Sequence, residues 1–134
     1  MSDADAVLFA NEVFYRAFAD RDTEAMLDLW SRAAPVACVH PGWGALFGYE
    51  AVMESWLSII RNPQSPAILC HDAHARQFGD TAAVICFEEI QGNYLIATNV
   101  FVREGRLWKM VHHQAGPTAA KPDLVASGPA GPMN

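Results

Sequence analysis

The sequence predicts an α+β domain whose helices gather on one face of a mostly antiparallel sheet. Three helical segments and a short strand come first, and four strand-like segments follow them. Two tight-turn signals, Gly92-Asn93 and Gly105-Arg106, join the last three strands as consecutive hairpins. Helices followed by a run of strands are typical of a sheet that helices cover on one side.

The helices are predicted from apolar side chains at helical spacing and from their end signals. Asp3 or Asp5 is expected to cap the first helix, and Asp22 the second. Asn62-Pro63 stops the third. The predicted helices cover residues 3–20, 23–30 and 49–61.

The strands are predicted from runs of apolar and β-branched residues bounded by turn signals. Between the first strand and the third helix, residues 41–48 form a Pro/Gly loop that carries Trp43. Residues 1–117 are expected to form a single domain, and the Pro/Gly/Ala-rich residues 118–134 a loose tail. The predicted strands are 36–40 and about 67–78, 81–91, 94–104 and 107–116.

Counting back from the two turns brings polar residues onto one sheet face. Pairing Glu104 with Leu107 places Asn99 opposite His112, and the other turn places Glu88 opposite Ala97. Side chains alternate along a strand, so these residues share a face. We expect a polar-bottomed pocket there, lined by Cys86, Glu88, Ala97, Asn99, His112 and Gln114.

Composition excludes several classes of protein. The 134 residues are 51% hydrophobic and 18% charged, which is typical of one globular domain. The net charge of −6, with scattered Lys and Arg, argues against nucleic-acid partners and against an anionic membrane surface. No apolar run approaches the length of a membrane span, and no secretory signal pattern opens the chain.

Cysteine and histidine placement gives no cofactor or metal site. Cys38, Cys70 and Cys86 lie in strand-like stretches, which favours reduced, buried thiols in a cytoplasmic protein. His71 and His74 are expected on opposite faces of their strand, so they do not share a metal ion unless the strand is bulged. No nucleotide-binding or serine-hydrolase motif is present, and we expect no cofactor.

The opposite sheet face is also predicted to be apolar. Three helices cover only one face, so the other needs a different cover. A second copy of the chain is the expected cover, which predicts a C2 homodimer through the outer sheet face. The residues of this face are Ile85, Phe87, Val100, Val102 and Val111.

Four segments resemble the SnoaL-like branch of the nuclear transport factor 2-like superfamily. They are FYRAFADRDTEAMLDLW, VACVHPGWGALFG, YEAVMESW and TNVFVREGRLWKMVHHQAGP, and the resemblance covers residues 5–117. It implies a cone-shaped α+β barrel, with a curved sheet wrapped around three helices, a cystatin-like fold and a pocket at the wide end. The superfamily includes isomerases, cyclases, dehydratases, non-catalytic ligand binders and assembly domains, and dimers through the sheet are common in it.

By position, the resemblance implies functional groups at His40 with Trp43, and at Glu88, Asn99 and His112. The chain has His40 where the ketosteroid isomerase pattern has an aspartate base, and it shows no matching Tyr-plus-Asp pair. Steroid-type isomerisation is therefore not expected.

Glu88 and His40 are the candidate acid–base residues. A carboxyl buried in an apolar strand is paired, hydrated or protonated, and a raised pKa suits it to proton transfer. The alternatives are a structural pair of Glu88 with His112 or an arginine, or exposure at a rim beside Glu89. His40 either shuttles a proton or caps backbone groups of the loop after it.

The candidate ligand-binding residues are Trp43, Asn99, His112, Tyr15 and Gln114. Asn99 either bonds a ligand or bonds His112 across the strands. His112 and His113 face opposite ways, so an error of one residue in a turn exchanges them. Trp43 is the better aromatic ligand contact because it lies in a loop, and Tyr15 supplies a phenol at the pocket mouth.

The expected function is binding of a small, largely apolar molecule with a polar head. If the protein is an enzyme, the expected chemistry is cofactor-independent proton transfer, as in isomerases, dehydratases and cyclases. Glu88 or His40 is then the base, while Asn99 and His112 hold an oxyanion. The alternatives are a non-catalytic ligand-binding domain and a dimeric assembly domain.

Overall fold

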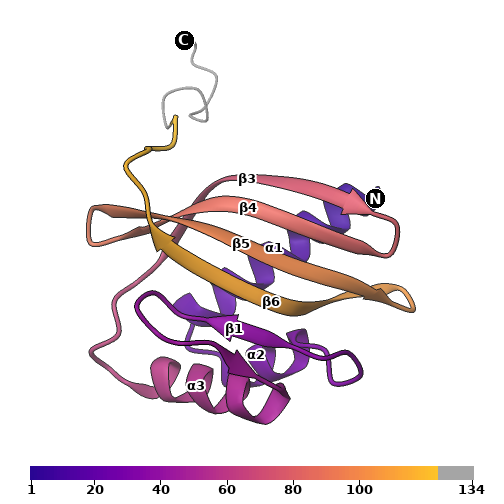
Figure 1. Cartoon of the computed structure of the whole chain (residues 1–134), viewed down its shortest axis with the longest axis horizontal. Coiled ribbons are helices and arrows are strands. Elements are labelled where there is room, and N and C mark those ends of the chain that lie inside the picture. The colour runs from indigo at the N-terminus through magenta and orange to yellow at the C-terminus, as the bar shows by residue number, and fades with distance from the viewer. Residues whose placement is uncertain (124–134) are drawn as a thin grey trace.

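The computed structural model describes residues 1–123 and confirms the α+β class (Figure 1). The predicted helices and strands all form, and one short strand, β2, arises within the predicted loop 41–48. Of the predicted tail, residues 124–134 lie outside the described part of the chain. The elements are α1 Asp3–Ala19, α2 Thr23–Leu29, β1 Ala37–Val39, β2 Leu46–Phe47, α3 Tyr49–Arg61, β3 Leu69–Phe78, β4 Thr81–Ile90, β5 Asn93–Glu104 and β6 Leu107–Pro117.

One mixed sheet organises the molecule. Its strand order is β2-β1-β6-β5-β4-β3, and all neighbours are antiparallel except β1 and β6, which run parallel. Helix α1 crosses behind the long strands in Figure 1, and α2 and α3 lie beside it near β1. The helices therefore enclose the inner sheet face, where the core lies. No helix within residues 1–123 is both long and apolar enough to cross a bilayer.

The helix caps are partly as predicted. Ser2, and neither Asp3 nor Asp5, caps α1, because its Oγ accepts a hydrogen bond from Asp5 N at 3.1 Å. Asp22 caps α2 as predicted, since its Oδ1 accepts from Ala25 N at 3.1 Å. The prediction for α1 is wrong because the helix already begins at Asp3, which makes Ser2 the N-cap residue.

The β4–β5 turn uses Gln91-Gly92, with φ of 52° and 82°, in place of the predicted Gly92-Asn93. Glu88 consequently pairs with Leu95 and not with Ala97. The pairing shift is two residues, which preserves the alternation of side chains. Glu88 therefore remains on the inner face, as predicted.

A β-bulge in β6 overturns the predicted position of His112. The hairpin pairs Glu104 with Leu107 as expected, but the pairing shifts between Phe101 and Val100. The extra residue on β6 moves every later side chain to the opposite face. As a result His113, and not His112, lies opposite Asn99 on the inner face.

A second irregularity, between His71 and His74 in β3, corrects another prediction. His71 pairs with Phe87 and His74 with Ile85, so both histidines lie on the outer face and not on opposite ones. Asp72, between them, has a φ of 55°. Each imidazole then has its own carboxylate partner at 2.8 Å, Glu89 for His71 and Asp72 for His74.

Arg21 fixes the connection between α3 and β3. It lies in the α1–α2 turn, and its guanidinium donates to the backbone carbonyls of Ile60 at 2.6 Å, Asn62 at 2.9 Å and Ser65 at 3.0 Å. The planar, five-donor guanidinium suits such multiple bonding, which a lysine does not reproduce. The helix pair is thereby tied to the segment that leads into the sheet.

We predict that Arg21→Ala lowers the free energy of unfolding by about 1–3 kcal/mol, because three charge-assisted hydrogen bonds are lost. Arg21→Lys should recover only part of this. Urea denaturation measures both. Arg16→Ala is the control, since its ion pair with Glu12 is exposed on both sides and should contribute less than about 0.5 kcal/mol. Equal effects of Arg21→Ala and Arg16→Ala would contradict the proposed stabilising role of Arg21.

Candidate functional site

A hydrogen-bonded group of polar side chains lies on the inner sheet face against α1. We call Asn11, Tyr15, Glu88, Asn99 and His113 the inner network. Glu88 is 2% exposed, Asn99 0% and His113 2%. Buried polar groups are costly unless they are paired, so their bonding partners define the site.

Each hydrogen bond of the inner network has a defined donor and acceptor. Tyr15 Oη donates to Glu88 Oε2 at 2.6 Å and accepts from Asn99 Nδ2 at 3.1 Å. The same Asn99 amide donates to Asn11 Oδ1 at 2.8 Å. Asn99 Oδ1 then needs a donor, which is His113 Nδ1 at 2.6 Å. His113 is therefore the tautomer that leaves Nε2 as an acceptor, and this atom lies 3.9 Å from Glu88 Oε2.

Burial shifts the pKa values of the titratable groups in the inner network. It raises the pKa of Glu88, against the opposing effect of the Tyr15 hydrogen bond. Burial, reinforced by the neighbouring Glu88 charge, also raises the pKa of Tyr15. Burial lowers the pKa of His113 to about 3, with smaller contributions from His40 and His112. The site thus combines a carboxyl whose pKa is raised with an imidazole that is neutral near pH 7.

Two thiols extend the polar region. Cys86 Sγ lies 3.3 Å from Tyr15 Oη, and Asn99 Nδ2 donates to it at 3.9 Å. Asn11 Nδ2 donates to Cys70 Sγ at 3.8 Å. Hydrogen bonds with Cys70, Tyr15 and Asn11 lower the pKa of Cys86, although burial and the nearby Glu88 charge oppose them.

His40 is buried at 3% exposure beside the inner network. Ser55 Oγ donates to Val52 O at 2.7 Å, so His40 Nε2 is the donor in its 2.8 Å bond with Ser55 Oγ. Burial lowers the pKa of His40 to about 4. The imidazole is therefore neutral near pH 7, and its Nε2 proton is committed to the helix α3 side.

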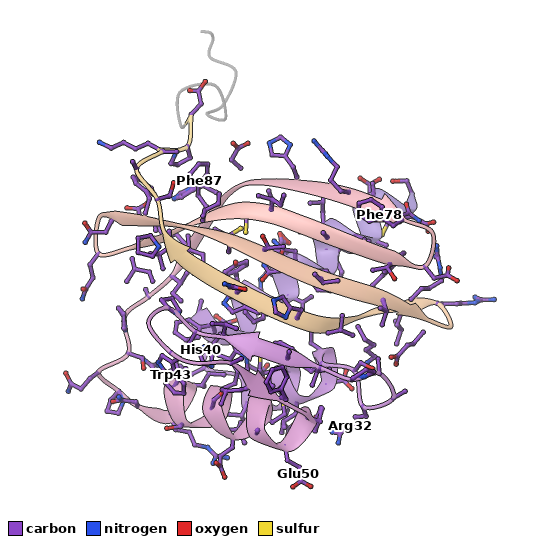
Figure 2. All side chains as sticks on the ribbon, in the orientation of Figure 1. Arg32, His40, Trp43, Glu50, Phe78 and Phe87 are labelled. Atoms are coloured by element: carbon purple, nitrogen blue, oxygen red, sulfur yellow. The ribbon has the colours of Figure 1, made fainter. Side chains whose placement is uncertain are left out.

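Trp43 covers His40 from the solvent side. Figure 2 shows the two labelled side chains side by side above α3. Their ring centroids are 4.7 Å apart in an edge-to-face arrangement, and Trp43 is 49% exposed. On its other side the His40 ring contacts Trp56 at 4.6 Å and lies 6.4 Å from His113. Trp43 thus separates an aromatic path to the inner network from solvent.

The structure brings five of the seven predicted site residues into this region and places two elsewhere. Glu88, Asn99 and Tyr15 form the inner network, with Tyr15 buried and not at a pocket mouth, and His40 adjoins it with Trp43. His112 and Gln114 pair with Val100 and Thr98 on the outer face, so they are wrongly placed in the prediction.

Sequence reasoning missed Asn11 and Ser55, and it gave His113 only as the alternative to His112. Asn11 lies between Val7 and Phe14 on the apolar stripe of α1, so helical periodicity was a usable signal. Ser55 similarly lies on the buried face of α3. His113 depended on a bulge, for which the sequence carries no clear sign.

Three surface depressions of about 450, 480 and 580 Å³ lie outside this region. The first, between α1, α2 and the β5–β6 turn, is lined mainly by apolar side chains such as Phe9, Val13 and Leu29. None of the three contains a residue of the inner network. The network is enclosed in this conformation.

Comparison with known proteins assigns the family. A family model described as a SnoaL-like domain matches residues 7–120, so the chain belongs to the SnoaL-like family of the NTF2-like superfamily. A crystal structure of a proposed dehydratase of the NTF2-like family from Streptomyces avermitilis is 35% identical, with a TM-score of 0.79 over 88% of this chain and 97% of that one. The predicted fold is confirmed.

Two further relatives have other descriptions. A crystal structure of a proposed calcium/calmodulin-dependent protein kinase type II association domain from Thiobacillus denitrificans is 31% identical, with a TM-score of 0.71 over 81% of this chain and 92% of that one. The F-box protein SKIP8 of Arabidopsis thaliana is 30% identical over 112 residues, 82% of this chain. The chain spans 48% of the length of that curated relative.

We predict that acid destabilises the protein through His40 and His113. Both have a pKa of 6.5 when unfolded and of about 4 and about 3 when folded, so the unfolded chain binds more protons from about pH 6.5 down to pH 3. Stability should fall by about 1–3 kcal/mol between roughly pH 7 and pH 5 in urea titrations. Glu88 acts in the opposite sense, because its raised pKa favours the folded state in acid.

His113→Gln should reduce this loss by about half, because one of the two groups is removed. His112→Gln is the matched control, since it changes the adjacent imidazole on the outer face. A loss of stability as steep in His113→Gln as in the control would contradict the assignment.

Proposed function

We propose that this chain is a ligand-binding domain whose inner network transfers a proton to or from a small molecule, as in isomerases and dehydratases. The observation that carries the proposal is the buried Glu88 carboxyl, bonded to Tyr15 at 2.6 Å and facing His113 Nε2 at 3.9 Å. A buried carboxyl with a raised pKa beside a neutral imidazole offers two proton-transfer groups in one water-poor site. No cofactor is required for this chemistry.

Glu88 is favoured over His40 as the acid–base group. Only one oxygen of Glu88 is used by Tyr15, whereas His40 directs its Nε2 proton to Ser55. Asn99 and Tyr15 act as positioning residues, because Asn99 spends both amide protons within the network. The 35% identical relative described as a proposed dehydratase supports this class of reaction.

Three thiols support a reducing, cytoplasmic location. Cys38, Cys70 and Cys86 are all free in the described residues, although Cys70 and Cys86 lie on adjacent strands. Secreted proteins more often oxidise such pairs.

The experiment starts from native mass spectrometry of the purified protein, to identify a co-purified molecule. We predict that Glu88→Gln abolishes turnover of that molecule, by about 100-fold or more, and retains its binding within about threefold. Glu89→Gln, one residue along on the outer face, should match the wild type. Full turnover in Glu88→Gln would exclude the acid–base role, and unchanged binding without turnover in every variant would indicate a non-catalytic ligand-binding domain.

A second function, assembly as a homodimer, is favoured by the outer sheet face. Ile85 is 44% exposed and Ile96 36%, and Phe87, Val100 and Val102 are partly buried beside them. Val111, expected on this face, is the bulged residue of β6 and packs against the core. Contiguous exposed apolar residues on a sheet are typical of an interface. The 31% identical relative described as an association domain supports this use of the fold. We propose a C2 homodimer through this face.

We predict that Ile85→Asp weakens this dimer by at least about 100-fold in Kd, because symmetry buries two carboxylates per interface. Sedimentation equilibrium or light scattering after gel filtration measures the change. Phe9→Asp is the control: Phe9 is 57% exposed but lies on α1, away from the sheet face. A dimer that resists Ile85→Asp, or a monomeric wild type, would contradict the proposal.

A further inference from the structure

The inner network needs a route to solvent if it is to meet a ligand. Its groups are at most 6% exposed, and none lines the surface depressions described above. Strands β4, β5 and β6 are joined by continuous backbone hydrogen bonding, and helix α1 covers them through side-chain hydrogen bonds from Tyr15 and Asn11. Moving any of these elements would break many bonds, so access through a loop is the less costly alternative.

The loop of residues 41–45 is the segment best suited to move. All five residues are exposed. Within the described part of the chain, one hydrogen bond reaches this loop, from Trp43 N to His40 O at 2.9 Å. Gly42 has a φ of 82°, and a side chain at Gly44 would meet no atom within 4 Å, so the loop has both conformational freedom and room.

Displacing Trp43 would open directly onto the aromatic path. The ring centroids of Trp43 and His40 are 4.7 Å apart, and those of His40 and His113 are 6.4 Å apart. His113 Nε2 is 3.9 Å from Glu88. One side-chain movement would therefore expose the first of three consecutive groups that lead to the buried carboxyl.

A donor without an acceptor lies along this path. The indole N–H of Trp56 is buried and has no hydrogen-bond partner among the described residues. Its ring contacts His40 at 4.6 Å and His113 at 5.6 Å. The nearest candidate acceptor is the Cys38 thiol: burial raises the pKa of Cys38 to about 12 and the Trp56 indole opposes this increase. A thiol sulfur is a weak hydrogen-bond acceptor. A ligand with an oxygen acceptor would satisfy it.

The buried polar residues of the described chain include no lysine or arginine. An anionic ligand would therefore lose its hydration without a positively charged partner, and a cationic one would need Glu88 to ionise against the burial that raises its pKa. A neutral molecule avoids this cost.

We propose that Trp43 gates access to the inner network, and that the molecule it admits is small, uncharged and carries a carbonyl-type acceptor for the Trp56 indole. This proposal rests on the inner network being the ligand site, and it names the route and the class of ligand. The gate itself is testable without any ligand.

The access test measures modification of His40 by diethyl pyrocarbonate, a neutral reagent for neutral imidazoles. In the wild type, His40 should react more slowly than His74, whose side chain is 60% exposed. Trp43→Ala should raise the His40 rate about tenfold, because the aromatic contact that closes the path is lost. Trp43→Phe should give a smaller increase, and Phe47→Ala, in the neighbouring strand β2, none. Peptide mass spectrometry follows each histidine separately.

Two outcomes would overturn the gate. One is a His40 rate that Trp43→Ala leaves unchanged. The other is a wild-type rate that rises steeply with low urea, because a local opening exposes little surface, whereas global unfolding is strongly urea-dependent. The urea measurement needs no variant, so it decides the matter even if Trp43→Ala does not fold.

The ligand class is tested by NMR of the Trp56 indole N–H, assigned with Trp56→Phe. Cyclohexanone at millimolar concentration should shift this resonance, and cyclohexanecarboxylate of the same ring size should not. An equal response to the carboxylate, or none to the ketone, would overturn the neutral-carbonyl assignment. These results are separate from the Glu88→Gln test: a gated His40 with Glu88-independent turnover would remove the proposed acid–base role and leave the gate.

Discussion

Burial of the Glu88 carboxyl constrains the rest of the interior. An ionised carboxylate at 2% exposure would be expensive in an apolar core, so the protein raises its pKa and supplies the Tyr15 hydroxyl at 2.6 Å. Tyr15 in turn needs a donor, which is Asn99, and Asn99 needs His113. Each partner fixes the next, so α1, β4, β5 and β6 are held in one relative arrangement by polar as well as apolar contacts.

Part of this interior could be predicted because an error of two residues in strand pairing leaves each side chain on its predicted face. An error of one residue does not. The β4–β5 turn was misplaced, yet the resulting pairing error for Glu88 was two residues, so its face was predicted correctly. In β6 the same method failed, because one bulged residue exchanges His112 for His113. Turn residues are visible in a sequence, whereas a bulge depends on how the sheet curves around its helices.

The polar partners from the helices show a different limit. Tyr15 was recognised as a possible contributor, but its bond to Glu88 depends on where α1 crosses the sheet. Asn11 sits on an apolar helix stripe, where a lone amide signals a buried hydrogen bond without naming the partner. The three-carbonyl contact of Arg21 likewise joins segments whose proximity only the folded chain reveals. Local sequence patterns predict the helices and strands, whereas tertiary packing determines which residues form hydrogen bonds between them.

The inner sheet face buries polar groups, and the outer face exposes apolar ones. The two proposed functions, proton transfer and dimerisation, therefore use different faces of one sheet. The inner face buries polar groups that bond one another, so it is stable when closed. The outer face leaves apolar groups such as Ile85 and Ile96 partly exposed, so covering it with a second surface would be stabilising. His112, turned outward by the bulge in β6, lies on that second face, while His113 belongs to the first. The β-bulge in β6 therefore decides which of the two adjacent imidazoles lies on the inner sheet face and which lies on the outer one.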